Sequence, residues 1–368
     1  MSVRVRIAPY SVSEYTSLVY AGLYELQAAG VIELVLDASL LGQTEGRSMH
    51  FATVLLQVDD SKSAKSKRLA FDFNDGCQLL SPELLSTADT YFKRSYRMST
   101  INQLPETERT RVRPFGLHYA CTSPTQSLRQ RWQLLREYQR SVLPSTKSYK
   151  KSSALRSSAK STLSLAFAKY WKSNCPSNLP PLIKELECEP TDATQSVIFY
   201  RTRVYGPTSV NAELGAAENE NRVAVIRALK REFGNRFVGG LRATEFAKKN
   251  FSDCVFEDDL NWRKHIGVMK RNLIGVTTAG LFDSTDWKLA EYLAAARCTV
   301  AEQLRYELPH PLQDGREFLS FDTPDECVGA CDRILTDSTL AESLRQNAHS
   351  YYNAHLAPAQ LMRTALGV

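Results

Sequence analysis

An α/β fold with parallel sheets is predicted by a strand–helix–strand segment in each half of the chain, with a proline-rich stretch between them. The C-terminal segment is the clearer: an apolar run over 273–276, a polar loop over 277–286, a helical stretch over 287–296 and an apolar run over 298–300. This order is typical of a parallel sheet, in which ligands bind at the carboxyl ends of strands. The 368 residues suffice for two domains of ordinary size.

The N-terminal half begins with the same order of elements. Apolar residues alternating with arginines predict a strand over 3–7, and an apolar run predicts another over 31–36. Between them, a capping-box spacing and a following glycine, Gly30, predict a helix over 11–29. This half therefore starts as a Rossmann-like domain does.

Two carboxylates stand close to a later strand. Apolar runs over 51–58 and 69–73 predict strands separated by a charged loop over 59–68, and Asp72 and Asp75 lie at the end of the second run. Carboxylates at strand ends are candidates for a catalytic base, and the same residue types also make Asx turns. The pattern leaves both interpretations open.

The middle of the chain is basic. Residues 129–160 hold nine Lys or Arg against one acid, and 145–164 hold eight Ser and five basic residues without an acid. A solvated loop, a contact with anionic lipid and a nucleic-acid patch are the three interpretations. Few interleaved aromatic residues and a net charge of only +6 disfavour nucleic acid.

A stretch with four prolines, 176–191, is expected to link two domains. Arg201 and Arg203 directly follow the first strand of the second domain, where guanidinium groups can hold phosphate oxygens. After residue 238, Gly239 and Gly240 are expected to allow a close backbone approach. The expected elements are strands over 196–200 and 236–238 and helices over 219–233, 324–335, 338–352 and 358–366.

The segment Gly275–Glu302 resembles the donor-binding segment of GT-B glycosyltransferases. Two acidic residues, Asp283 and Glu291, have seven residues between them, and the second precedes an Ala-rich turn. The surrounding WKLAEYLAAA is similar to exostosin-like and bacterial polysaccharide glycosyltransferases. Many members have Glu where this chain has Asp283, and Gly where it has Arg297. The clear resemblance covers residues 196–366.

The resemblance implies a fold and a reaction. The fold would be two Rossmann-like domains facing each other across a cleft, with residues 1–180 on the acceptor side, 191–350 on the donor side and 351–368 crossing back to the first domain. The reaction would move a sugar from a UDP- or GDP-linked donor to a hydroxyl of a glycan or glycolipid. No metal or other cofactor would be needed.

The resemblance also implies roles for single residues. Glu291 would accept hydrogen bonds from the donor's ribose, and Lys288 and Arg201 would neutralise the leaving diphosphate. The base would come from the first domain, with Asp75 preferred and Asp72 second. The full set of expected donor-binding residues is Arg201, Arg203, Thr277, Thr278, Gly280, Asp283, Lys288 and Glu291.

Other classes of protein have little support in the sequence. The eight Cys include no CxxC pair, the six His include no HExxH, and no GxGxxG follows a predicted strand. No run approaches the roughly 18 apolar residues of a membrane helix, and the N-terminus lacks an apolar signal core. We therefore expect a cytoplasmic enzyme, with peripheral membrane contact through the basic segment as an option. The alternative is a non-catalytic nucleotide- or carbohydrate-binding module on the same fold.

Overall fold

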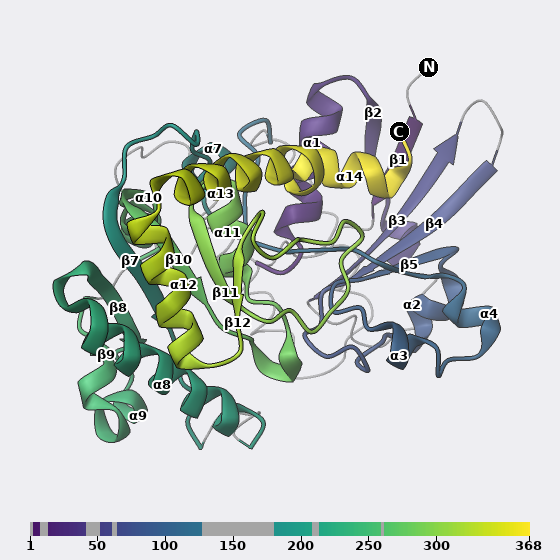
Figure 1. Ribbon diagram of the computed structural model, residues 1–368. Coiled ribbons are helices and arrows are strands. Elements are labelled where there is room, and N and C mark those ends of the chain that lie inside the picture. The colour runs from purple at the N-terminus through teal and green to yellow at the C-terminus, as the bar shows by residue number, and fades with distance from the viewer. Residues whose placement is uncertain are drawn as a thin grey trace. The chain divides into compact units, whose positions relative to one another are not determined.

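The computed structural model describes residues 3–7, 14–41, 52–60, 65–126, 180–207, 213–258 and 261–368. The chain forms two compact units, one of Met1–Ile183 with Ala357–Val368 and one of Lys184–Leu356 (Figure 1). Each unit contains one six-stranded sheet. The predicted α/β class with two Rossmann-like domains is confirmed, as is the return of the last helix to the first domain. The basic stretch 129–160 lies outside the described residues.

The sheet of the first unit is parallel apart from one strand. Its order is β2-β1-β3-β4-β5-β6, and β3 runs antiparallel to both of its neighbours. The chain continues from β1 to β2 on one side and from β4 to β6 on the other. The strands are β1 (Val3–Ile7), β2 (Ile32–Leu36), β3 (Thr53–Asp60), β4 (Lys65–Asp72), β5 (Thr90–Lys93) and β6 (Val112–Pro114).

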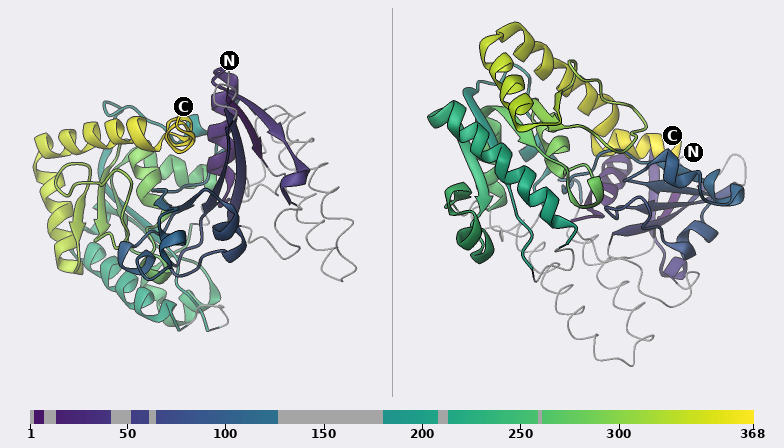
Figure 2. Two further views of the ribbon diagram at one scale, coloured as in Figure 1. Left: turned by 90° about the vertical axis from the view of Figure 1, so that its right-hand side faces the viewer. Right: turned by 60° about the horizontal axis from the view of Figure 1, so that its bottom comes forward.

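Helices from the two ends of the sequence pack together in this unit. Helix α14 (Pro358–Leu366) lies against α1 (Ser17–Ala28) (Figures 1 and 2). Gly22 permits this approach, because a Cβ there would lie 2.2 Å from the carbonyl oxygen of Pro358. The short helices are η1 (Ala38–Leu41), α2 (Pro82–Thr87), α3 (Met98–Ile101) and α4 (Glu106–Arg109).

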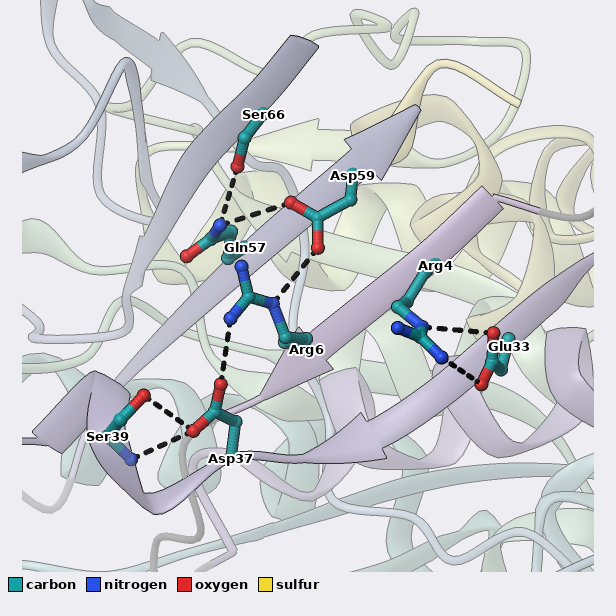
Figure 3. Close-up of polar contacts among 8 residues, drawn as sticks. All are labelled: Arg4, Arg6, Glu33, Asp37, Ser39, Gln57, Asp59 and Ser66. Carbon is teal, nitrogen blue, oxygen red and sulfur yellow. Dashed lines mark hydrogen bonds and ion pairs between the residues drawn. The ribbon is translucent and has the colours of Figure 1, made fainter. Parts of the chain in front are cut away.

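One face of the β1 region carries a polar network (Figure 3). The Arg6 guanidinium donates to Asp37, which follows β2, and to Asp59 on β3, each at 3.0 Å. Val5 and Ile7, which alternate with Arg6, are fully buried, so the arginines of β1 point away from the core. Asp37 also accepts from the backbone N–H and hydroxyl of Ser39, so it caps a turn.

The sheet of the second unit is wholly parallel. Its order is β12-β11-β10-β7-β8-β9, so the chain runs outward from β7 on one side and from β10 on the other. The strands are β7 (Gln195–Thr202), β8 (Phe237–Arg242), β9 (Val255–Phe256), β10 (Asn272–Thr277), β11 (Cys298–Glu302) and β12 (Leu319–Phe321).

Helices cover both faces of this sheet. Ile198 and Tyr200 of β7 share a hydrophobic cluster with α8 and α12, whereas Phe199 between them contacts His265 of α10. On that second face Tyr292 of α11 packs against Gly275. The helices are α7 (Ile183–Leu186), α8 (Gly215–Phe233), α9 (Glu245–Asn250), α10 (Trp262–Arg271), α11 (Trp287–Ala294), α12 (Pro324–Thr336) and α13 (Ser338–Tyr351), with short turns η2 (Gly234–Arg236), η3 (Ser252–Cys254), η4 (Leu281–Asp283) and η5 (Tyr352–Leu356).

Three elements differ from the sequence prediction. Helix α1 begins at Ser17, because residues 14–16 form a turn in which the Ser17 hydroxyl donates to the carbonyl of Glu14. The expected charged loop 59–68 is mostly strand, since β3 and β4 stay paired as far as Asp60 and Lys65. Arg201 lies within β7 rather than after it.

Candidate functional site

The carboxyl ends of β7 and β10 form the topological switch point of the second unit. These strands are neighbours, and the chain leaves them in opposite directions across the sheet. Ligands of doubly wound sheets bind in the crevice outside such a point. Arg201 is the second-last residue of β7, Arg203 follows the strand, and Thr277 ends β10. Four of the expected donor-binding residues, these three and Thr278, therefore stand at the switch point.

The loop after β10 is tightly held. Thr278 shares a hydrogen bond of 2.8 Å with the Tyr200 hydroxyl, and the backbone N–H of Gly280 donates to the Ser284 carbonyl at 2.7 Å. A Cβ on Gly280 would lie 2.6 Å from the Ser284 hydroxyl, so the loop needs glycine there. Thr277 is 3% exposed, and its hydroxyl has no hydrogen-bond partner. A buried hydroxyl without a partner is costly, which suits a group awaiting a ligand.

The end of this loop adopts left-handed backbone. Phe282 and Asp283 have φ angles of 59° and 58°, a conformation that side chains other than Gly, Asn and Asp rarely adopt. Asp283 is exposed there. Strain of this kind concentrates at functional sites.

Helix α11 begins with an ion pair. The carboxylate of Asp286 caps the helix by accepting from the backbone N–H of Lys288, and its second oxygen lies 2.5 Å from the Lys288 ammonium. Burial alone would raise the pKa of Asp286. The charges of Lys288 and Arg222 outweigh that effect and hold the pKa below its usual value. The cation of Lys288 thus stands at the helix start with its carboxylate partner.

Glu291 lies one turn further along α11 and is buried. It is 2% exposed, and its carboxylate lies 3.7 Å from the Nε2 of His265 on α10. Glu291 is therefore not a surface carboxylate. A buried carboxylate needs compensating partners, and a His at this distance supplies only one weak contact.

Two residues that the sequence analysis did not identify, Arg222 and Glu302, contact the loops at this switch point. The Arg222 guanidinium on α8 donates to the carbonyl of Arg203 at 2.7 Å and to that of Ala279 at 2.8 Å. Glu302, the last residue of β11, accepts from the N–H of Ala279 at 2.9 Å. A signal existed for Arg222, since it stands three positions before Val225 and four before Ile226 on a helix that is otherwise apolar there.

In the first unit, Asp72 lies at the end of β4 inside a closed polar cluster. It is 1% exposed and 3.2 Å from the Lys93 ammonium, and it accepts from the Tyr91 hydroxyl and from both nitrogens of Asn74. Burial lowers the pKa of Lys93, against the opposing effect of Asp72. Lys93 also donates to the carbonyls of Asn74 and Leu79, so the cluster fixes the loop after β4.

Asp75 stands within that fixed loop and reaches the surface. Its side chain is 31% exposed, and one oxygen lies 2.6 Å from the buried guanidinium of Arg94. Strand β3 separates β1 from β4 in the first sheet, and the chain runs outward from β1 on one side and from β4 on the other. The loop after β4 therefore belongs to the switch point of this sheet. Of the two candidate bases, Asp75 is partly exposed and Asp72 is buried.

Among the described residues there is neither a cluster of metal-ligating side chains nor a helix that could span a membrane. No group of three or more His, Cys, Asp or Glu side chains there is arranged to hold a metal ion. Within the same residues no helix has both the length and the apolar character needed to cross a bilayer.

Residues 222–367 match a family model described as glycosyl transferase-like. Among proteins of curated function, none matches the sequence. Several solved structures are similar to the chain at low sequence identity. The C-terminal domain of LpcC, a group 1 glycosyl transferase from Francisella tularensis, is 12% identical with a TM-score of 0.33, covering 44% of this chain and 87% of its own.

Two further structures are similar over more of the chain. A variant of TarM from S. aureus, solved with UDP, is 8% identical with a TM-score of 0.39, and the match covers 100% of this chain and 99% of TarM. HepE from Anabaena, solved with UDP-glucose, is 9% identical with a TM-score of 0.35 and coverages of 78% and 82%.

Proposed function

We propose that the chain transfers a sugar from a nucleotide-sugar donor to an acceptor hydroxyl, because residues 222–367 match a glycosyl transferase-like family model and the chain has two Rossmann-like units. A UDP- or GDP-linked donor and a glycan or glycolipid acceptor are the substrate classes that we favour. The observation that carries the proposal is the switch point at the carboxyl ends of β7 and β10, where Arg201, Arg203 and the loop with Gly280 lie.

The donor diphosphate fits the cationic edge of this crevice. Arg201 and Arg203 would pair with its oxygens, and the backbone amides of Thr277, Thr278 and Gly280 would line the same edge. Lys288 would add positive charge at the start of α11, once its ion pair with Asp286 adjusts to the anion. Glu291 would accept hydrogen bonds from the ribose, and Asp283 would lie at the rim.

The reaction would be a direct displacement. The acceptor oxygen forms a bond to the anomeric carbon, the bond from that carbon to the diphosphate oxygen breaks, and the electron pair leaves with the nucleoside diphosphate. Asp75 would take the proton of the acceptor hydroxyl, and the arginines would stabilise the charge that develops on the leaving group. We propose that these cations perform this role without a bound metal or other cofactor.

The location and the acceptor are also part of the proposal. A cytoplasmic enzyme that touches anionic membrane through residues 145–164 would meet a lipid-linked acceptor there. That segment lies outside the described residues, so the membrane contact stays a prediction from its charge.

Nucleotide binding tests the proposal first. A ligand that binds only the folded state raises the melting temperature, so UDP or GDP should do so while the matching nucleoside monophosphate has a smaller effect. Release of free sugar or its transfer from the corresponding nucleotide sugar should then be measured with the same protein. Binding without any turnover would favour the non-catalytic module, and no stabilisation by any nucleoside diphosphate would reject both.

A further inference from the structure

The Tyr205 ring has two guanidinium groups near it, beside the carboxyl end of β7. The Cζ of Arg203 is 5.3 Å from the centre of its ring, and the Cζ of Arg222 is 5.1 Å from it. Cations over an aromatic face are attracted by its quadrupole. We call these three residues the Arg203–Tyr205–Arg222 stack. Arg203 is exposed, Tyr205 is half-buried and Arg222 is buried, so the stack leads from the protein interior to the surface.

The ring at its centre is fixed from two sides. The side chain of Asn219 accepts from the backbone N–H of Tyr205 at 2.8 Å and donates to its carbonyl at 2.9 Å. Gly215 lies under the ring, where a Cβ would come within 2.6 Å of Tyr205 carbons. Both contacts come from the first turns of α8, so the helix holds the aromatic residue rigidly.

The buried guanidinium joins the two strand-end loops. Arg222 is 2% exposed and donates to the carbonyl of Arg203, after β7, and to that of Ala279, after β10. Its planar fork can bridge two acceptors at once, which an ammonium group cannot do with the same geometry. The Nε of Arg222 is buried without a hydrogen-bond partner. The residue therefore fixes the separation of the two loops that flank the switch point.

We propose that Tyr205 and Arg222 are positioning residues for the diphosphate of the nucleoside diphosphate. Tyr205 holds the exposed guanidinium of Arg203 at the carboxyl edge of the sheet. Arg222 holds the backbone of Arg203 and Ala279, so that the guanidinium and the loop amides meet the same anion. Preorganised donors cost less to align when the ligand binds and when charge develops on the leaving group. The inference rests on the proposed function, since it takes the diphosphate as the ligand of Arg203.

Isothermal titration with UDP, GDP and the matching nucleosides tests the stack. The variants are Tyr205→Leu, Tyr205→Phe and Arg222→Lys. Tyr205→Leu removes the ring and should weaken the affinity for the diphosphate about tenfold, the size of one lost charge-assisted contact. It should change the nucleoside affinity less than about twofold on the same scale. Tyr205→Phe keeps the ring and loses only the hydroxyl that interacts with Arg222, so its affinity should stay closer to that of the parent than the affinity of Tyr205→Leu.

Arg222→Lys keeps the charge and loses the fork, so it should weaken diphosphate binding and lower kcat more than it raises KM for the donor. The matched control is Arg236→Lys, because Arg236 lies 5.7 Å over Phe233 at the other end of α8. The control should bind the diphosphate normally. If Arg222→Lys does not fold, the two Tyr205 variants decide the matter.

The outcomes separate this inference from the proposed function. A parent protein that binds no nucleoside diphosphate would reject the proposed function. A parent that binds it while Tyr205→Leu and Arg222→Lys bind equally well would reject the stack alone. Equal losses of nucleoside and diphosphate affinity, with a lowered melting temperature, would show a purely structural role and would also overturn the inference.

Discussion

Asp72 and Asp75 stand three positions apart and have opposite surroundings. Asp75 is partly exposed beside Arg94, in a loop that Lys93 holds in place. We expect Asp75→Asn to fold, to bind the donor nucleotide and to lose transfer by roughly 100-fold or more, since an amide cannot take the acceptor proton. Single-turnover transfer and nucleotide titration on the same preparation measure the two effects. Transfer at the parental rate would remove Asp75 as the base.

Asp72 should behave differently. Its carboxylate is the buried partner of Lys93, and loss of one member of such a pair typically costs on the order of 3 kcal/mol. Asp72→Asn should therefore lower the melting temperature by roughly 6–12 °C. Calorimetry would measure this shift. A variant that melted like the parent and yet lost all transfer would reverse the assignment of the two carboxylates.

Glu291 gives the third residue-level prediction. Glu291→Gln should weaken nucleoside diphosphate binding about tenfold or more, because a charged acceptor for the ribose hydroxyls becomes a neutral one. A nucleotide lacking the ribose hydroxyls should bind parent and variant alike. Glu342→Gln is the control, since Glu342 is exposed on α13, where it accepts a hydrogen bond from the side chain of Gln346. Unchanged affinity in Glu291→Gln would leave this buried carboxylate without the role we give it.

The candidate site residues that directly follow strands could be predicted from the sequence. Those whose position depends on packing between separate elements could not. Thr277 and Arg203 were found because polar residues directly follow apolar runs. Arg222 was missed, because an Arg on a helix is ordinarily read as solvent-facing and its two carbonyl partners come from separate loops. The contact of Glu291 with His265 was not predicted, since it joins α11 to the preceding helix.

At the scale of elements, the network around Arg6 makes the first sheet sensitive to acid. Hydrogen bonds from Ser39, and then Arg6, lower the pKa of Asp37. Burial opposes the shift of Asp59, but Ser66, Gln57 and Arg6 together lower its pKa as well. A carboxylate whose pKa is lower in the folded state than in the unfolded state stabilises the fold. This contribution is complete above the unfolded-state pKa of about 3.9 and is lost as the pH falls through the folded-state pKa.

We therefore expect Arg6→Met to be less stable than the parent at pH 7, by about 1 kcal/mol for these partly exposed pairs. The difference should shrink below about pH 4, where the carboxylates of both proteins become protonated. Urea unfolding at a series of pH values measures it. Arg4→Met is the control, because the Arg4–Glu33 pair is about half exposed and should matter less. A difference that stayed constant with pH would contradict the electrostatic origin.

The boundaries of elements were harder to predict than their order. The run 59–68 is charged, and charge in a sequence usually indicates a loop. Here the side chains of a hairpin face water while its backbone stays paired.

Gly239 and Gly240 lie inside β8 with φ angles of 134° and 135°, and a Cβ on Gly239 would lie 2.0 Å from the Tyr200 carbonyl. The expected close approach is correct, but it occurs within a strand that the glycines were thought to end.

For the molecule as a whole, the contact of α14 with α1 decides how the first unit is completed. In Gly22→Ala the new methyl group would clash with the Pro358 carbonyl and with Met362, whose Cγ would lie 2.5 Å away. Backbone cannot turn aside as a side chain can, so we expect a loss of about 1–3 kcal/mol of stability. This loss exceeds the gain of roughly 1 kcal/mol in helix stability that replacing Gly by Ala brings on its own.

The control for this change is Gly267→Ala in α10, where a Cβ would meet nothing within 4 Å. It should raise stability by a few tenths to 1 kcal/mol. Limited proteolysis gives the second readout, because a displaced α14 should be cut earlier in Gly22→Ala than in the parent. If both glycine variants were equally stable and equally resistant, the packing of α14 on α1 would not limit the stability of the first unit.

The same contact sets an order of events during synthesis. The first unit needs residues 357–368, which a ribosome makes only after the whole of the second unit. Until then the face of α1 around Gly22 lacks the helix that packs on it, so the nascent chain carries an exposed apolar surface. The second unit, by contrast, is one continuous stretch and can fold as soon as it emerges. The first unit is therefore translated first but completes its fold last. Between these two events its apolar surface is open to chaperones that bind unfolded chains.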